Sequence, residues 1–199
     1  MAVNLADLIY NATRNLFKLY ARLIMRVEVT GSENIPETGP LVVMSNHISY
    51  LDPPLIGAIM PRKIHYMAKA ELFENKVIGA FLKKLGAFPL KRGTGDSRAF
   101  RKAIKILRSE EVLGIFPEGT RYPEGSPGEP HSGSVMFAIM AKTPILPMAI
   151  KNIKRKGRPK VIIGEPLVLE EYFGKKLKKE EREEVANRVM SEIISLLNE

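Results

Sequence analysis

Residues 41–52 read Leu-Val-Val-Met-Ser-Asn-His-Ile-Ser-Tyr-Leu-Asp, an apolar run that passes directly into polar residues. The apolar run Leu41–Met44 predicts a buried strand. Asp52, which precedes a proline, predicts the start of a helix that carries Leu55 and Ile59 on one face. A strand followed by a helix is the repeating unit of α/β proteins, so this stretch indicates the fold class.

Further apolar runs alternate with helical patterns along the rest of the chain. A short strand is expected around Val27 and Val29, and a helix is expected to begin at Asp96 or Ser97. A last helix is expected from about Lys179 to Leu197. The other strand-like runs are Ile64–Ala68, Ala87–Leu90, Val112–Phe116, Ile145–Ile150 and Val161–Gly164. We therefore expect an α/β fold with a mixed central sheet flanked by helices.

The N-terminal part has a different pattern. Apolar residues recur at helical spacing from Leu5 to Met25, and four cations are spaced four residues apart, at Arg14, Lys18, Arg22 and Arg26. Such a helix suits the headgroup region of an anionic bilayer, although a helix packed on its own domain has a similar pattern. We expect residues 1–30 to form an amphipathic membrane-associating segment and residues 31–199 to form the main domain.

Composition narrows the possible functions. The chain has 199 residues and a formal net charge of +9, so its surface should attract nucleic acid, anionic lipid or an acidic carrier protein. It has no cysteine, which excludes disulfides, thiolate metal sites and a cysteine nucleophile. No 18-residue stretch is free of charge, and we expect neither a membrane-spanning helix nor a signal peptide.

The first polar motif is Asn46–Asp52, at the end of the first buried strand. His47 and Asp52 can form a general base and the carboxylate that orients it. Asp52 has an ordinary alternative role, because Ser49 and Asp52 also match a helix-capping pattern.

Two more polar motifs follow strand-like runs. Lys91 and Arg92 end the segment Gly86–Arg92 beside glycines, which suits phosphate binding. The segment Phe116–Arg121 brings Glu118, Gly119, Thr120 and Arg121 to another strand end, where they could bind hydroxyl and phosphate groups. Ligands of α/β sheets bind at the carboxyl ends of strands, so we expect these loops to converge.

The order of these segments resembles the glycerolipid acyltransferases, the 1-acylglycerol-3-phosphate acyltransferase family. The matching segments are the N-H-x-x-x-x-D box at Asn46–Asp52, Met67–Phe73, Gly86–Arg92, Phe116–Arg121 and Thr143–Pro147. One segment departs from the family pattern: Pro130-His131-Ser132-Gly133 stands where many relatives have Phe-Lys-x-Gly. The departure concerns the acceptor side of the site.

The resemblance implies transfer of an acyl group from acyl-CoA or acyl carrier protein to the sn-2 hydroxyl of lysophosphatidic acid. His47 would be the general base and Asp52 would orient it. Arg92 and Arg121 would bind the acceptor phosphate, with Lys91 a further candidate. Glu118 and Thr120 would shape the glycerol end of the pocket. Backbone N–H groups near Gly119 or Asn46 are candidates for stabilising the oxyanion.

The expected partners are an anionic membrane surface, a lysophospholipid and the acyl donor, with no cofactor, metal or nucleic acid. The expected location is the cytoplasmic face of the cell membrane. The same chemistry on glycerol-3-phosphate or another lysophospholipid is an alternative. A serine hydrolase using Ser45, or a non-catalytic membrane- or nucleic-acid-binding module using the basic segment Lys151–Lys160, would be a different class of protein. His65 and His131 are expected to be structural or solvent-exposed.

Overall fold

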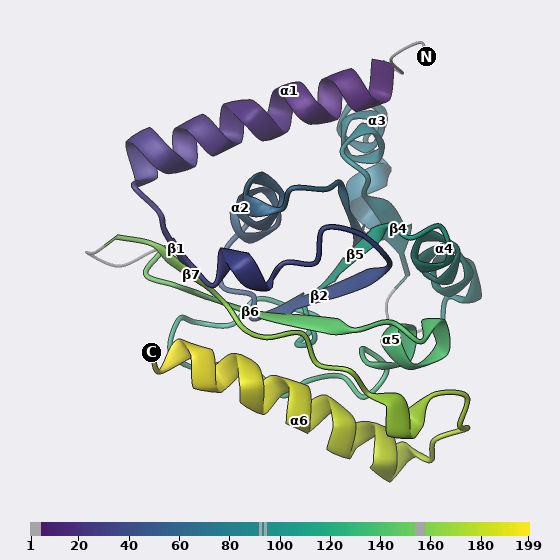
Figure 1. Cartoon of the computed structure of the whole chain (residues 1–199). Helices are drawn as coiled ribbons and strands as arrows, with labels where there is room; N and C mark the ends of the chain where they lie inside the picture. The colour runs from purple at the N-terminus through teal and green to yellow at the C-terminus, as the bar shows by residue number, and fades with distance from the viewer. Residues whose placement is uncertain (1–4, 92, 94, 154–157) are drawn as a thin grey trace.

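The computed structural model describes residues 5–91, 93, 95–153 and 158–199. A seven-stranded sheet in the order β1-β7-β6-β2-β5-β3-β4 crosses the molecule, with helices on both faces (Figure 1). Neighbouring strands run parallel except β6 and β7, which are antiparallel. The predicted α/β fold with a mixed central sheet is therefore confirmed.

All the expected strands form, with ends within one residue of the predicted ends. They are β1 (Glu28–Thr30), β2 (Leu41–Ser45), β3 (Ile64–Lys69), β4 (Phe88–Leu90), β5 (Val112–Ile115), β6 (Ile145–Lys151) and β7 (Lys160–Ile163). Strand β2 lies in the middle of the sheet and is buried along its whole length. Helices cover both faces of parallel strands, which explains why β2 is continuously apolar rather than alternating.

The helices are α1 (Leu5–Tyr20), α2 (Asp52–Ile59), α3 (Lys76–Lys84), α4 (Ser97–Arg108), α5 (Met136–Ala141) and α6 (Lys179–Leu197). The predicted cap of α4 is confirmed, because Oδ1 of Asp96 accepts hydrogen bonds of 3.1 Å from the backbone N–H groups of Arg98 and Ala99. Helices α3 and α5 were not predicted. They have only 9 and 6 residues, too few for a clear helical period.

The sheet separates two apolar cores. Helices α4, α5 and α6 cover one face, where Leu107, Leu113 and Val189 are buried together. Helices α1 and α2 cover the other face, where Leu55 and Ile48 are buried in the second core. Ile48 directly follows His47, so the first polar motif lies on the α1 and α2 side of the sheet.

The N-terminal helix differs from the prediction in one respect. Regular α1 ends at Tyr20, and a π-helical turn continues to Met25 before Arg26 takes a left-handed conformation. The predicted continuous row of four cations is wrong, because Arg14 points toward the domain and donates a 3.1 Å hydrogen bond to the carbonyl of Pro61. Lys18 and Arg22 remain exposed. The change of helical pitch after Tyr20 also breaks the regular spacing.

Candidate active site

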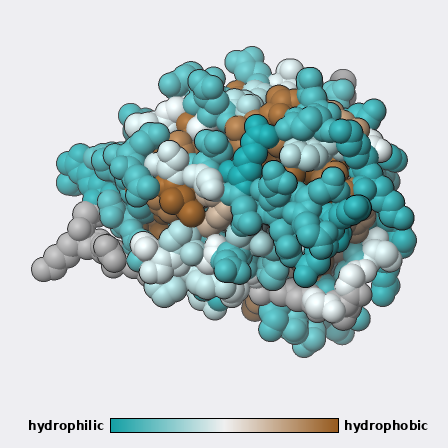
Figure 2. Space-filling view, turned by 90° about the horizontal axis from the view of Figure 1, so that it is seen from below, coloured by the Kyte–Doolittle hydropathy of each residue, from teal (hydrophilic) through white to brown (hydrophobic). Residues whose placement is uncertain are grey.

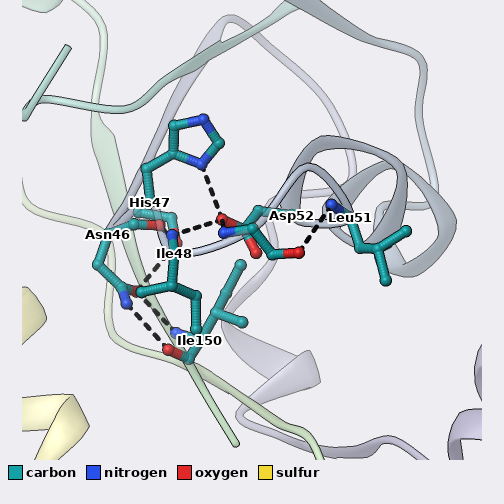
Figure 3. Close-up of polar contacts among 8 residues, drawn as sticks. Asn46, His47, Ile48, Leu51, Asp52 and Ile150 are labelled. Atoms are coloured by element: carbon teal, nitrogen blue, oxygen red, sulfur yellow. Dashed lines mark hydrogen bonds and ion pairs between the residues drawn. The ribbon is translucent and has the colours of Figure 1, made fainter. Parts of the chain in front are cut away.

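His47 and Asp52 lie together at the carboxyl end of β2 (Figure 3). Nδ1 of His47 is 2.7 Å from Oδ2 of Asp52. The same oxygen accepts 2.7 Å hydrogen bonds from the backbone N–H groups of Ile48 and Ser49. The Asp52 side chain is fully buried, whereas 12% of the His47 side chain is exposed. A buried carboxylate therefore holds an imidazole that solvent or substrate can reach.

These contacts identify the proton donor of the His47–Asp52 pair. Backbone amides can only donate, so Oδ2 of Asp52 acts as an acceptor, and Nδ1 of His47 must carry the third proton. Nε2 of His47 is then left with its lone pair, as a general base requires. The helix-capping pattern is also present, because the N–H of Ser49 donates to Oδ2 of Asp52 and the Ser49 hydroxyl accepts a 3.1 Å hydrogen bond from the N–H of Leu51, so Asp52 has both roles.

Asn46 joins this loop to the neighbouring strand β6. Its side-chain amide donates a 2.9 Å hydrogen bond to the carbonyl of Ile150 and accepts a 2.8 Å bond from the N–H of Ile150 (Figure 3). The side chain thus replaces one rung of the backbone ladder at the point where β2 ends. These two hydrogen bonds therefore fix the backbone just before His47 relative to the sheet.

Two aromatic rings pack in series against one face of the His47 imidazole. The ring of His47 stacks on Phe116 with centroids 4.0 Å apart, and Phe116 stacks on Tyr66 with centroids 5.9 Å apart. Tyr66 fits because Gly114 on the adjacent strand has no side chain, and a Cβ there would lie 2.2 Å from the Tyr66 ring. Burial is the main cause that raises the pKa of the Tyr66 phenol well above its ordinary value. Sequence reasoning missed these positioning rings; the place of Phe116 at a strand end was the available signal.

The third motif meets the first, as predicted, because β5 is a direct neighbour of β2. The backbone N–H of Tyr122 donates a 2.9 Å hydrogen bond to the carbonyl of His47. The guanidinium of Arg121 lies over the ring of Tyr50. Arg121 and Thr120 are exposed, so both can meet a ligand that approaches the loop.

Glu118 is the buried member of the third motif, with 2% of its surface exposed. Burial is the largest cause that raises its pKa to about 7, and the negative charge of Asp52 adds to this effect. The nearby backbone amides of His47 and Gly128 favour the ionised form and oppose only part of the shift. Glu118 therefore changes charge near neutral pH, and it does so close to the backbone of His47 and to Asp52.

The second motif lies further away. Lys91 follows β4, which is the edge strand, and two strands separate β4 from β2. This separation amounts to about 14 Å at the usual strand spacing. Lys91 is exposed, and its backbone N–H donates a 3.1 Å hydrogen bond to Asp96. Arg92 lies outside the described residues. The structure thus unites the first and third motifs and leaves the second at the rim.

In both regions that were expected to supply oxyanion donors, backbone N–H groups are already engaged. The N–H of Gly119 donates a 3.0 Å hydrogen bond to the carbonyl of Phe116, and those of Ile48 and Ser49 are bound to Asp52. A Cβ at Gly119 would lie 2.5 Å from the ring of His131, so His131 packs against the third motif. His131 is exposed, as expected, and it also lies beside Gly119 of the third motif. The loop that carries it folds back, and its N–H bonds to the carbonyl of Pro117 at 2.8 Å.

Other groups near the site have structural contacts. The Ser45 hydroxyl is buried and donates a 3.1 Å hydrogen bond to the carbonyl of Asn46, so it is not directed at His47 as a nucleophile would be. His65 lies in β3 between the carbonyl of Gly86 and the carboxylate of Glu111, which confirms its structural role. No cluster of metal-binding side chains occurs within the part of the chain that the structure describes.

A cavity of ≈ 270 Å³ lies on the far side of Asn46 from His47. It is bounded by the loop at Glu124, by Lys151 at the end of β6 and by Leu197 at the end of α6. The N–H of Asn152 donates a hydrogen bond to the Glu124 carboxylate, which ties this loop to the sheet. Among the described residues of the three polar motifs, Asn46 alone lines the cavity.

Comparison with known proteins adds independent information. Residues 26–151 match the family model described as Acyltransferase. The chain is 41% identical over 165 residues to a 1-acyl-sn-glycerol-3-phosphate acyltransferase of Bacillus subtilis, covering 79% of this chain and 82% of that protein. It is 34% identical over 146 residues to a lyso-ornithine lipid O-acyltransferase of Pseudomonas aeruginosa, covering 72% of this chain and 54% of that protein.

A solved structure has the same architecture. The 1-acyl-sn-glycerophosphate acyltransferase PlsC from Thermotoga maritima superposes with a TM-score of 0.72 and 27% sequence identity. The match covers 94% of this chain and 80% of that chain.

Proposed function

Because the chain belongs to the acyltransferase family, we propose that it transfers an acyl group from a thioester to the sn-2 hydroxyl of lysophosphatidic acid, giving phosphatidic acid. The observation that carries the proposal is the buried Asp52 carboxylate that orients the accessible His47 imidazole. The names of the relatives from Bacillus subtilis and Thermotoga maritima support this acceptor.

The chemistry follows from the tautomer of His47. Nε2 removes the proton of the acceptor hydroxyl while its oxygen attacks the thioester carbonyl. The imidazolium that forms is stabilised by Asp52, whose position does not change. When the tetrahedral intermediate collapses, the carbon–sulfur bond breaks and the leaving thiolate takes the proton from His47. Transfer is direct, since Ser45 is buried and bonded to the backbone.

The acceptor phosphate is assigned to Arg121 and Arg92, with Lys91 as a third cation. The exposed guanidinium of Arg121, held beside the His47 loop, supports its part in this assignment. Glu118 and Thr120 bound the glycerol end of the pocket. In its protonated form Glu118 can donate a hydrogen bond to an acceptor oxygen, and its raised pKa supports this role near neutral pH.

The acyl donor is acyl-CoA or acyl carrier protein, and the reaction needs no cofactor or metal. The formal net charge of +9 favours both of these acidic donors. No nucleic acid is part of this function.

Helix α1 attaches the enzyme to the cytoplasmic face of the membrane. No described helix is long and apolar enough to cross a bilayer. Polar contacts hold α1 on the domain: Asp7 pairs with Lys63 at 3.1 Å, and the hydroxyl of Tyr10 accepts a 3.1 Å hydrogen bond from the N–H of Ile64. The outer side of α1 and the following turn exposes Leu5, Leu8, Leu16, Leu19, Leu23 and Ile24. Helix α1 and the turn after it pack on their own domain through Tyr10, Phe17 and Ala21, and their exposed apolar side suits an interfacial helix as well.

The first test incubates the purified protein with acyl-CoA and lysophosphatidic acid in anionic vesicles. Thiol release and phosphatidic acid are measured for the wild type and for His47→Ala. Both products should form with the wild type and be lost in the variant. Free fatty acid as the main product would instead identify a hydrolase, and no thiol release with either acyl-CoA or acyl carrier protein would refute the proposal.

A second acceptor deserves a parallel assay. A relative from Pseudomonas aeruginosa is named for a lyso-ornithine lipid, which has no phosphate. If the arginines select the acceptor, lysophosphatidic acid should be preferred over lyso-ornithine lipid in kcat/KM. The opposite preference would reassign the acceptor while leaving the role of His47 intact.

A further inference from the structure

Helix α3 exposes a second apolar surface that the proposed reaction does not use. The exposed fractions are 80% for Val77, 49% for Ile78 and 47% for Phe81, with Leu72 at 46% in the preceding 3-10 turn. The opposite side of α3 is fixed to its own domain, because a Cβ on the buried Gly79 would lie 2.9 Å from the carbonyl oxygen of Phe73. These four residues, the α3 patch, therefore remain on the outside of the fold.

The α3 patch belongs to a helix that lies next to the N-terminal end of α1. The two helices contact each other, and α3 lies beneath the N-terminal end of α1 (Figure 1). Leu5 and Leu8, which are 63% and 56% exposed, lie at this end of α1. Several exposed apolar side chains on two neighbouring helices are uncommon on soluble monomers and indicate an interaction surface.

Charge and shape indicate what covers this surface. The exposed cations Lys76 and Lys83 lie in α3, and Lys18 and Arg22 lie along the α1 side. Aliphatic side chains beside lysines suit anionic lipid, where the apolar groups enter the hydrocarbon boundary and the cations meet phosphate. The side opposite α1 is different: viewed from there, the molecule is mostly hydrophilic (Figure 2).

We propose that the α3 patch is a second membrane contact, so that the enzyme binds an anionic bilayer through both α1 and α3. The inference rests on the membrane attachment within the proposed function. One helix alone leaves the domain free to rotate about the helix axis, whereas two contacts at an angle determine which way the His47 loop faces.

The absence of tryptophan makes a direct test possible. Single substitutions Phe81→Trp and Leu16→Trp report on α3 and α1, and Met140→Trp is the control. Met140 is 51% exposed and belongs to α5, which lies on the other side of the sheet. Each full-length variant is mixed with vesicles of phosphatidylethanolamine and phosphatidylglycerol, with and without brominated acyl chains.

Emission from Phe81→Trp should shift to the blue and be quenched by the brominated lipid, as for Leu16→Trp, while Met140→Trp should remain unquenched. Quenching of Leu16→Trp without quenching of Phe81→Trp would overturn the proposal and leave attachment through α1. A blue shift of Phe81→Trp without vesicles that grows with protein concentration would show that a second copy covers the patch, and would also overturn it.

A loss-of-function pair gives an independent measurement. Val77→Ser with Phe81→Ser should weaken partitioning into these vesicles by about tenfold or more, from the apolar surface removed. Met140→Ser with Val168→Ser removes side chains that are 51% and 48% exposed from the other face and should have no effect. Equal partitioning of the two double variants would contradict the proposal. Binding is measured without turnover, so failure here is distinguishable from failure of the acyl-transfer proposal.

Discussion

The guanidinium carbon of Arg121 lies 3.5 Å from the centroid of the Tyr50 ring. Tyr50 belongs to the first polar motif and Arg121 to the third. This contact therefore joins the loops that follow the neighbouring strands β2 and β5. Tyr50 is 77% exposed, which means that its ring supports Arg121 from the solvent side. The stacking restrains the guanidinium while leaving its N–H groups available for an anion.

We predict a graded effect when this contact is changed. Arg121→Ala should raise the KM for lysophosphatidic acid by about tenfold or more, because a phosphate–arginine contact is lost. Tyr50→Ala should raise it only about two- to fivefold, the value of an exposed cation–π contact, and Tyr50→Phe should be close to neutral because the ring is kept. Steady-state kinetics with acceptor and donor varied separately measure these changes. Equal effects on the KM for the acyl donor would contradict the assignment.

Replacement of the catalytic pair should affect kcat. His47→Ala should lower kcat by about 10²–10⁴, the usual contribution of general base catalysis. Asp52→Asn should have an effect of similar size, because an amide can favour the tautomer in which Nε2 of His47 carries the proton. Asp7→Asn, an exposed carboxylate on α1, is the matched control. Activity above a few per cent in His47→Ala would exclude this residue as the base, provided that circular dichroism shows an intact fold.

Glu118 makes stability depend on pH in a defined direction. Its pKa is raised from 4.5 to about 7 in the native protein, so the native state binds more protons than the unfolded state between these values. Stability should therefore decrease as pH rises through this range. Glu118→Gln removes the effect and should be more stable than the wild type at pH 8 by about 1–3 kcal/mol, with a much smaller difference at pH 4.5.

Thermal unfolding of both proteins from pH 4.5 to 8 measures this difference. Glu129→Gln, at an exposed glutamate of the following loop, is the control. A difference that is the same at every pH would show that Glu118 does not titrate in this way.

Asn46 should matter for folding because its side chain replaces a backbone rung. Asn46→Ala leaves the N–H and the carbonyl of buried Ile150 without partners and should lower the free energy of unfolding by about 2–4 kcal/mol. Asn34→Ala is a comparison, since Asn34 donates one hydrogen bond of 3.0 Å to the carbonyl of Ile163 and should cost less. Urea denaturation at neutral pH measures both. An unchanged midpoint for Asn46→Ala would refute the structural role.

The central strands β2, β5 and β6 were predictable because each is a buried apolar run bounded by polar residues. Leu41–Ser45 is buried throughout, and covering of both sheet faces produces this simple signal. The short helix α3 was not predictable, because its largest apolar side chains face outward. Because these side chains are exposed, the usual relation between apolar residues and burial does not hold for α3.

The candidate site was predictable in part for a similar reason. Their spacing in the sequence brought His47 and Asp52 together, because His47 lies in the loop after β2 and Asp52 begins the helix that follows this loop. The neighbour relation of β2 and β5 depends on strand order, which local patterns do not contain, and this relation determines that Arg121 meets Tyr50. The burial of Glu118 depends on which loops cover it, so its raised pKa could not be inferred from the motif.

The packing of α1 on α2 has an energetic consequence for the lipid. Asp52 is the first residue of α2, and α2 lies directly beneath α1 (Figure 1). Packed helices are about 8–10 Å apart, so in the proposed attachment through α1 the glycerol group of the acceptor would move only about the thickness of one helix out of the bilayer to reach His47. Each methylene group drawn into water costs about 0.8 kcal/mol, and most of the acyl chain can stay behind. Turnover should then follow the mole fraction of acceptor in the two-dimensional lipid phase, and dilution with inert lipid should slow it at constant bulk concentration.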